Sequence, residues 1–235
     1  MNLLEEIRSA FDRVADPSRA EGAERFFKDQ PIAMRGVPAP EIHRVARDFY
    51  PRVKKLSVVE RDRLCTGLWA SGRFEEGALV CYLYRRFAEQ CGAREFVLFT
   101  RWLDRYVHNW GHTDGLALWL LGASIANDAA LINRLDGWTR SKNRWKRRAA
   151  AVSLVYSAKR GEHTRVILRI AKPLIEDADD MVQKGIGWLL KETYPKRPKE
   201  VVRFLVANRP QTTRLVLRYA AEKMTAADRA RVLAH

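Results

Sequence analysis

Cysteine is scarce in this chain, which has three cysteines among 235 residues, at positions 65, 81 and 91. Their number is odd, and no two of them form a Cys-x-x-Cys pair. So sparse a set excludes a disulfide framework and a cysteine-ligated zinc site as the organising features of the fold. We therefore expect Cys65, Cys81 and Cys91 to be free, reduced and mostly buried thiols.

Long hydrophobic runs are also missing. Residues 111–126, the least charged stretch near the middle, still contain Thr113, Asp114 and Ser124. This stretch falls short of the roughly 18 apolar residues that a membrane span needs. The first residues, Met-Asn-Leu-Leu-Glu-Glu-Ile-Arg, have neither the basic start nor the apolar core of a signal peptide. We expect a soluble, cytoplasmic protein with no membrane partner.

Several signatures of cofactor and acyl-transfer chemistry are absent. The chain has no P-loop, no dinucleotide-binding glycine fingerprint and no Gly-x-Ser-x-Gly elbow. His108 and His112 stand four residues apart, a spacing that two ligands of one metal can use, but no third ligand is apparent. We therefore expect no metal, no cofactor and no nucleotide.

Positive charge, in contrast, is in excess. Lys and Arg number 43 against 28 Asp and Glu, which gives a formal net charge of +15 and a pI near 10.1. Residues 140–148, Arg-Ser-Lys-Asn-Arg-Trp-Lys-Arg-Arg, include six cationic side chains and no acidic one. The alternative reading of such a stretch is a solvated helix face. A run of one sign repels itself unless something negative lies against it, so we favour phosphate contact and a polyanionic partner.

A helical period runs through almost every segment, and we find no convincing alternating strand, so the predicted fold class is all-α. The first apolar stripe begins at Leu3 and stops at Asp16-Pro17. Pro40 lies in the first turn of the next helix, and Ser57-Val-Val-Glu60 is a capping box. Further helices are predicted at 74–90, 94–109, 113–126, 129–139, 143–159, 163–177, 180–193, 199–208 and 212–224.

A weak internal repeat sets residues 144–171 against 180–207, an offset of 36 positions. Each copy is a helix pair, and a fainter third copy begins near residue 113. Repeats of this kind predict an α-solenoid of HEAT-like helix pairs with a concave basic groove, formed by residues 1–235 as a single domain. The alternative is an irregular helical bundle. In a solenoid, Asp114, Arg148 and Gln183-Lys184 begin successive units and share one surface.

Aromatic side chains recur near the centre of the chain. Trp102, Tyr106 and Trp110 are spaced by four, which predicts one face of one helix, and Trp110 is soon followed by Asp114. Aromatic rings beside a carboxylate suit a cationic ligand. The simpler alternative is that the rings are core and that Thr113 or Asp114 caps the next helix.

Trp188 lies in Gln-Lys-Gly-Ile-Gly-Trp-Leu-Leu, where it is either a core residue or part of a ligand site. Gly185 and Gly187 are unusual inside a helix, because each costs about 1 kcal/mol relative to alanine. They would permit the close approach of another helix or of a ligand.

Three motifs carry a resemblance to a known family: Asn109-Trp110-Gly-His-Thr-Asp114, Asn143-x-Trp-x-x-Arg148-Ala-Ala and Gln183-Lys-x-Ile-Gly-Trp188-x-Leu. In this order and spacing they resemble the AlkD-type DNA alkylation repair glycosylases, which are built from HEAT-like repeats. The likeness covers nearly the whole chain. The sequence departs from the family pattern at Asn109, Phe26 and Pro38.

The resemblance implies a monofunctional glycosylase that removes positively charged N3- or N7-alkylated purines from duplex DNA without base flipping. The enzyme would be a monomer, associated with the nucleoid through DNA. The catalytic set implied is Asp114, Trp110 and Trp188, with Asp114 stabilising an oxocarbenium-like transition state. The DNA contacts implied are Arg148, Arg144, Arg147, Lys184, Gln183 and Phe26. The alternatives are a non-catalytic HEAT-like module that binds DNA or RNA by shape and charge, and a protein-binding scaffold.

Overall fold

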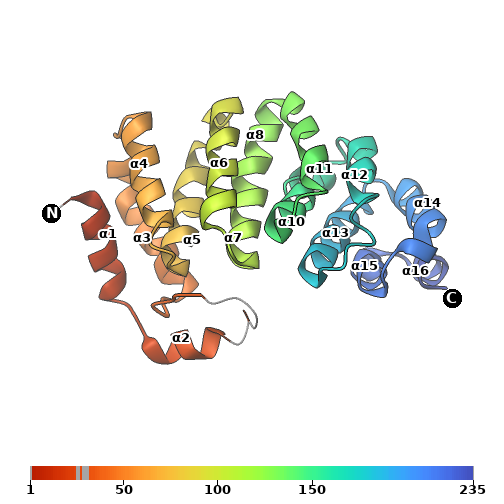
Figure 1. Cartoon of the computed structure of the whole chain (residues 1–235), viewed down its shortest axis with the longest axis horizontal. Coiled ribbons are helices and arrows are strands. Elements are labelled where there is room, and N and C mark those ends of the chain that lie inside the picture. Colours follow the sequence, from red (N-terminus) through yellow and green to blue (C-terminus); the bar gives the residue numbers. More distant parts are fainter. Residues whose placement is uncertain (1, 25–26, 28–31, 235) are drawn as a thin grey trace.

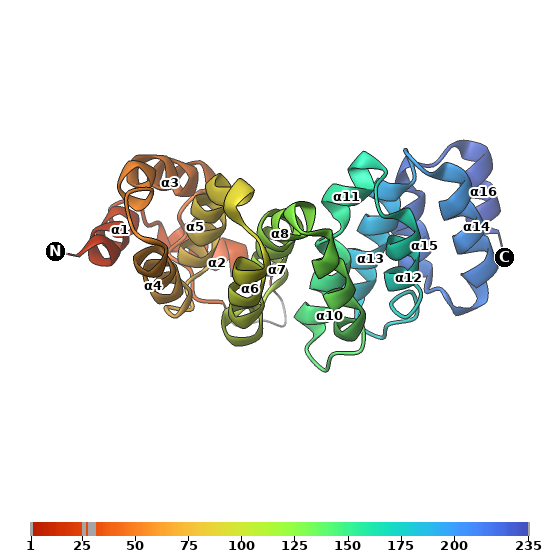
Figure 2. The same ribbon diagram turned by 90° about the horizontal axis from the view of Figure 1, so that it is seen from above.

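The computed structural model describes residues 2–24, 27 and 32–234, and it is a curved stack of short helices (Figure 1). The chain advances steadily from one end of the stack to the other, so the N- and C-termini lie at opposite ends (Figures 1 and 2). In the described part of the chain the regular structure is helical, apart from an isolated bridge between Ala33 and Arg73. The predicted all-α solenoid is confirmed; the concave basic groove stays a prediction.

The helices of the first half of the chain come before the long helical element that begins at residue 110. Their bounds are α1 Leu3–Asp12, α2 Pro17–Glu24, α3 Ala39–Val53, α4 Val58–Trp69, α5 Phe74–Tyr84 and α6 Ala93–Tyr106, with the 3-10 segment η2 Arg85–Gln90 after α5. The predicted start signals are confirmed. The Ser57 side chain accepts a hydrogen bond from the Glu60 amide while the Glu60 carboxylate reaches back to Ser57, and Pro40 lies in the first turn of α3.

One long helical element runs from residue 110 to residue 127. It consists of α7 Trp110–Gly115, the π-helical segment η3 Leu116–Leu121 and α8 Gly122–Asn127. The segments η4 Ala129–Arg134 and α9 Leu135–Trp138 follow it.

The second half continues the same pattern of paired helices. Its bounds are α10 Arg144–Val152, α11 Val155–Arg160, α12 Thr164–Ala171, α13 Asp180–Thr193, α14 Pro198–Asn208, η5 Arg209–Gln211, α15 Arg214–Ala220, η6 Ala221–Lys223 and α16 Ala226–Leu233. The first predicted copy, 144–171, contains three helices, α10, α11 and α12, whereas the second, 180–207, contains the pair α13 and most of α14. Helix α16 was not among the predicted helices.

The first helices of successive pairs form one row. Along this row α3 packs on α5, α5 on α7, α7 on α10, α10 on α13 and α13 on α15. One continuous apolar core joins the helices along the stack, and it includes the fully buried rings of Trp69, Tyr84 and Trp102. Because each first helix contacts the next, side chains from distant units reach a common surface.

The three cysteines are free and buried, as predicted. Burial raises the pKa of the Cys91 thiol to about 12 and also raises the pKa of the Cys65 and Cys81 thiols. No helix in the described ranges is both long and apolar enough to cross a membrane.

The prediction that Trp102, Tyr106 and Trp110 share one helix face is wrong. Helix α6 ends at Tyr106, and the backbone is extended at Val107 and Asn109. Asn109 then starts a new helix, because its side-chain oxygen accepts a 2.8 Å hydrogen bond from the His112 amide. Trp102 therefore stays in the core, whereas Trp110 opens α7.

Candidate functional site

One pocket is lined by side chains from four neighbouring helices, all of them in the row formed by the first helices of the pairs. Trp110 and Asp114 of α7, Arg148 of α10, Trp188 of α13 and Tyr219 of α15 line a cavity of about 410 Å³. Its other lining residues, Met181, Lys184 and Lys191, lie on the same face of α13 as Trp188. The predicted catalytic residues are thus brought together with Arg148 and Lys184.

Asp114 is paired with Arg148 in a two-pronged ion pair. Arg148 Nε lies 2.7 Å from Asp114 Oδ1 and Nη2 lies 2.8 Å from Oδ2, while Nη1 donates to the Met181 carbonyl. The Arg148 side chain is only 7% exposed, against 19% for Asp114. The alternative in which Thr113 or Asp114 caps a helix does not hold, because Asn109 is the N-cap and Asp114 lies inside the helix.

Gly185 makes room for this ion pair. A Cβ atom at position 185 would lie 3.1 Å from Arg148 Cγ and 3.5 Å from Arg148 Nη1. The 3.1 Å distance is tighter than ordinary van der Waals contact, so a side chain here would press on the arginine that holds Asp114. The glycine that the helix pattern left unexplained is therefore accounted for by packing against Arg148.

The ring of Trp110 is backed by the amino-terminal segment. Phe27 stacks on it with ring centroids 5.4 Å apart and an interplanar angle of 17°, and Phe27 also contacts Phe74 at 5.5 Å. The predicted DNA contact Phe26 lies outside the described residues. Nothing in the local sequence pattern joins Phe27 to Trp110, which lies 83 positions away, so this support of the Trp110 ring is visible only in the folded chain.

His112 is buried behind the same aromatic group, with both ring nitrogens engaged. Asn109 Nδ2 donates to Nδ1 at 3.0 Å, and Nε2 donates to the Phe74 carbonyl at 2.8 Å. Burial lowers the pKa of His112 to about 4. His108, which the sequence spacing paired with His112 as a possible second metal ligand, is exposed. The residues that the structure describes contain no cluster of three or more potential metal ligands.

The buried neutral imidazole predicts a pH-dependent stability. Between about pH 6.5 and about pH 4 the unfolded chain binds a proton at His112 that the folded chain does not. Stability is therefore lost as the pH falls through this window. Lowering the pH from 7 to 5 should cost the wild type roughly 2 kcal/mol more than His112→Gln. Urea unfolding of both proteins at the two pH values measures this difference, and identical pH dependences would contradict it.

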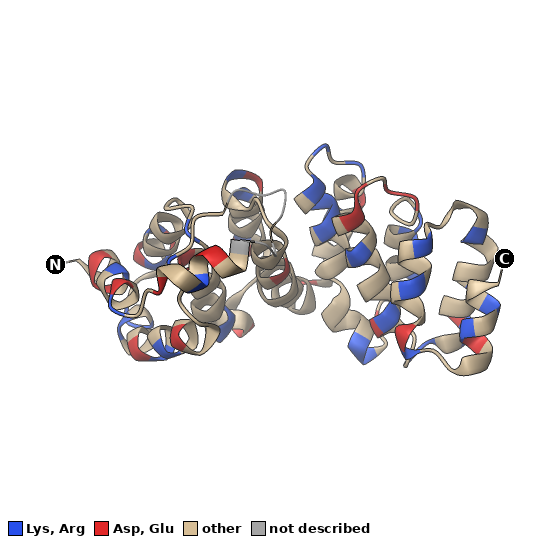
Figure 3. Cartoon of the chain, turned by 90° about the horizontal axis from the view of Figure 1, so that it is seen from below, with Lys and Arg blue, Asp and Glu red and all other residues tan. Residues whose placement is uncertain are grey.

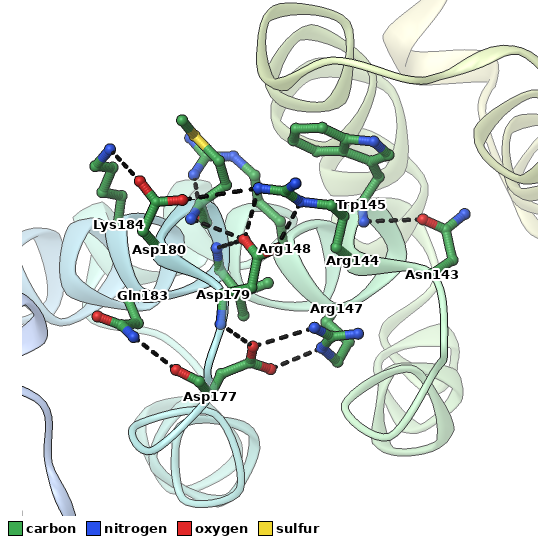
Figure 4. Close-up of polar contacts among 12 residues, drawn as sticks. Asn143, Arg144, Trp145, Arg147, Arg148, Asp177, Asp179, Asp180, Gln183 and Lys184 are labelled. Carbon is green, nitrogen blue, oxygen red and sulfur yellow. Dashed lines mark hydrogen bonds and ion pairs between the residues drawn. The ribbon is translucent and has the colours of Figure 1, made fainter. Parts of the chain in front are cut away.

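The basic stretch 140–148 meets negative charge within its own chain. The acidic segment, Glu176 to Asp180, supplies the carboxylates: Arg144 Nε lies 2.7 Å from Asp179 Oδ2, and Arg147 Nε lies 2.7 Å from Asp177 Oδ2 (Figure 4). Hydrogen bonding to Asp177 raises the pKa of Arg147. The self-repulsion inferred from the sequence is thus relieved internally, and phosphate contact by Arg144 and Arg147 stays a prediction.

Lys184 and Gln183 differ in what they face. Lys184 lines the pocket, and its Nζ lies 2.7 Å from Asp180 Oδ2. Gln183 is not among the pocket residues; it donates to the Asp177 carbonyl at 2.7 Å and accepts from the Thr213 hydroxyl at 3.0 Å. Figure 3 shows Lys and Arg on successive helices of the C-terminal half, with an acidic loop beside them.

The chain is thus a basic helical-repeat protein with one pocket that a carboxylate and aromatic side chains line together. Residues 7–224 match the family described as DNA alkylation repair enzyme. The chain belongs to this family, so it is a DNA alkylation repair enzyme and its partner is DNA.

Solved structures support the fold. A predicted DNA alkylation repair enzyme from Enterococcus faecalis is 16% identical, with a TM-score of 0.80 over 90% of this chain and 97% of that one. AlkD2 from Streptococcus mutans is 19% identical, with a TM-score of 0.60 over 80% of this chain and 91% of that one. No curated protein matches the sequence.

Proposed function

We propose that this protein is a monofunctional DNA glycosylase that releases positively charged N3- and N7-alkylated purines from duplex DNA. The observation that carries the proposal is the meeting of Trp110, Asp114 and Trp188 in one open pocket. Two indole faces attract a cationic base, and the carboxylate lies beside them to stabilise positive charge on the sugar.

Release of a cationic purine requires the protein mainly to stabilise positive charge on the sugar. When the bond between C1′ and the alkylated purine nitrogen breaks, its electron pair leaves with the base and neutralises the charge on the purine. The base therefore needs no general acid, and the sugar becomes oxocarbenium-like. The Asp114 carboxylate stabilises this cation. A water molecule then adds to C1′ and gives up its proton, for which Asp114 is the acceptor at hand.

Because the pocket is open, a lesion can enter it while staying close to the duplex, and we propose excision without base flipping. We further propose that the enzyme acts as a monomer and without a nucleotide cofactor. Arg148 is engaged by Asp114 and by the Met181 carbonyl. We therefore assign Arg148 the positioning of Asp114 as its principal role. We assign phosphate contact to Lys184, Arg144 and Arg147. Each of these side chains is paired with an aspartate, and a DNA phosphate would replace that aspartate as its partner.

The proposal is tested by release of free bases from methylated duplex DNA. We expect the wild-type protein to liberate 7-methylguanine and 3-methyladenine and to leave unmodified purines in place, with abasic sites formed in equal number and no strand cleavage by the enzyme itself. Chromatography of the released bases measures this. Tight DNA binding with no release above the spontaneous rate would overturn the glycosylase and favour a non-catalytic DNA-binding module.

A further inference from the structure

Tyr219 shares the pocket with the two tryptophans but was not among the residues indicated by the sequence. It lies on α15, is half-buried, and lines the cavity together with Trp110, Asp114 and Trp188. Its neighbours Val216, Leu217 and Ala220 are buried and hold α15 against the core. Helix α15 is therefore the third helix, after α7 and α13, that brings an aromatic residue to the pocket.

Gly187 determines how closely Tyr219 approaches. A Cβ atom at position 187 would lie 2.5 Å from Tyr219 Cβ, closer than real Cβ atoms come, and 3.4 Å from Tyr219 Cγ. Glycine in the interior of α13 costs about 1 kcal/mol relative to alanine. This cost is offset by the tight contact between α13 and α15 that the missing side chain allows. The second unexplained glycine of the sequence thus accounts for the position of Tyr219, as Gly185 does for Arg148.

The start of α15 is tied to α13 by a second contact. The Thr213 hydroxyl caps α15 by accepting from the Val216 amide and donates at 3.0 Å to the Gln183 side chain. The Thr213 amide also donates to the Ile175 carbonyl at 3.1 Å. With one anchor at Thr213 and another where Tyr219 Cβ meets Gly187, α15 is fixed against α13, the helix that carries Trp188.

We propose that Tyr219 is a third aromatic wall of the pocket and a specificity-determining residue for cationic bases. This inference rests on the proposed function and deepens it. A cation gains attraction from each aromatic face it meets, whereas a neutral purine gains no such charge-dependent term. Tyr219 therefore raises the preference for an alkylated, cationic purine over unmodified guanine without changing the grip on the DNA backbone.

The test measures binding in the Asp114→Asn background, so that the lesion is not consumed. Two duplexes identical except for one central 7-methylguanine are compared, and the readout is the ratio of their dissociation constants. Tyr219→Leu removes the aromatic face but keeps an apolar side chain, and Tyr219→Phe keeps the ring. Tyr156→Leu is the matched control, because Tyr156 is 52% exposed on α11 and lies outside this pocket.

Tyr219→Leu is expected to lower the lesion preference about 2- to 30-fold, the span for a cation over an exposed to a desolvated ring. Tyr219→Phe and Tyr156→Leu should keep the parental ratio, and affinity for the unmodified duplex should stay the same in all variants. A parental ratio in Tyr219→Leu would overturn this inference alone, and equal losses on both duplexes would reduce Tyr219 to a structural role. If the Asp114→Asn protein showed no preference for the lesion and the wild type released no base, the glycosylase proposal itself would be overturned.

Discussion

Asp114→Asn is expected to lower the rate of base release by at least about 100-fold, the loss typical when a group aimed at developing transition-state charge is removed. Asparagine keeps the size of the side chain but not its negative charge. The oxocarbenium-like sugar would then face a neutral amide, and water attack would lose its proton acceptor. DNA affinity should stay within about threefold of the wild type, since one charge near a phosphate is a small part of the whole electrostatic interaction. Single-turnover release of 7-methylguanine measures the first effect, and titration of the same duplex measures the second.

Asp104→Asn is the matched control for this loss of charge. Asp104 lies on α6, is 43% exposed and pairs with Lys146 at 2.7 Å, outside the pocket. The control removes the same charge from the same protein and should retain wild-type release. If both variants lost activity equally, the effect would be one of overall charge; if Asp114→Asn kept its activity, another group would have to stabilise the sugar cation.

Arg148→Ala is expected to impair both stability and activity. The substitution leaves the partly buried Asp114 carboxylate without its two-pronged partner and the Met181 carbonyl without its donor. Breaking a buried ion pair in this way costs about 3–5 kcal/mol, and because Asp114 keeps some contact with solvent we expect the lower end, about 3 kcal/mol. In a chain of this size the melting temperature should fall by roughly 6–12 °C. Base release should also fall, because Asp114 is no longer held towards the pocket.

Two further variants separate the role of this pair from a general loss of charge. Arg169→Ala breaks an exposed pair with Asp136, in which both side chains are about half exposed, and should cost less than about 1 kcal/mol. The double variant Asp114→Ala/Arg148→Ala should be less destabilised than the two single variants added together, because neither charge is left unpaired. Additive losses would show that the two side chains do not depend on each other.

Local patterns in the sequence predicted the helices well where a start signal was explicit. Ser57 and Pro40 begin their helices as expected, because a cap or a first-turn proline acts within a few residues. The pattern failed between residues 106 and 110. Apolar and aromatic spacing continued across that gap, while Asn109 broke the helix with its own cap and moved Trp110 away from the Trp102 face.

Charge was predicted in amount but not in pairing. The stretch 140–148 contains no acidic residue, and the acidic segment lies some 30 residues later in the chain. Folding places Asp177 against Arg147 and Asp179 against Arg144. A count of charges along the chain contains no information about such distances, whereas Coulomb energy depends on them directly.

The all-α class, the paired helices and the identity of the aromatic and acidic candidates all follow from residue order, because helix periodicity, capping and motif spacing act over short stretches of chain. The pairing of Asp114 with Arg148, the stacking of Phe27 behind Trp110 and the approach of Tyr219 over Gly187 join residues 32 or more positions apart. These contacts exist only after the first helices of successive repeats have packed in a row. The spacing of that row depends on where glycine allows two helices to come close, and it is this tertiary packing that brings the scattered side chains into one pocket.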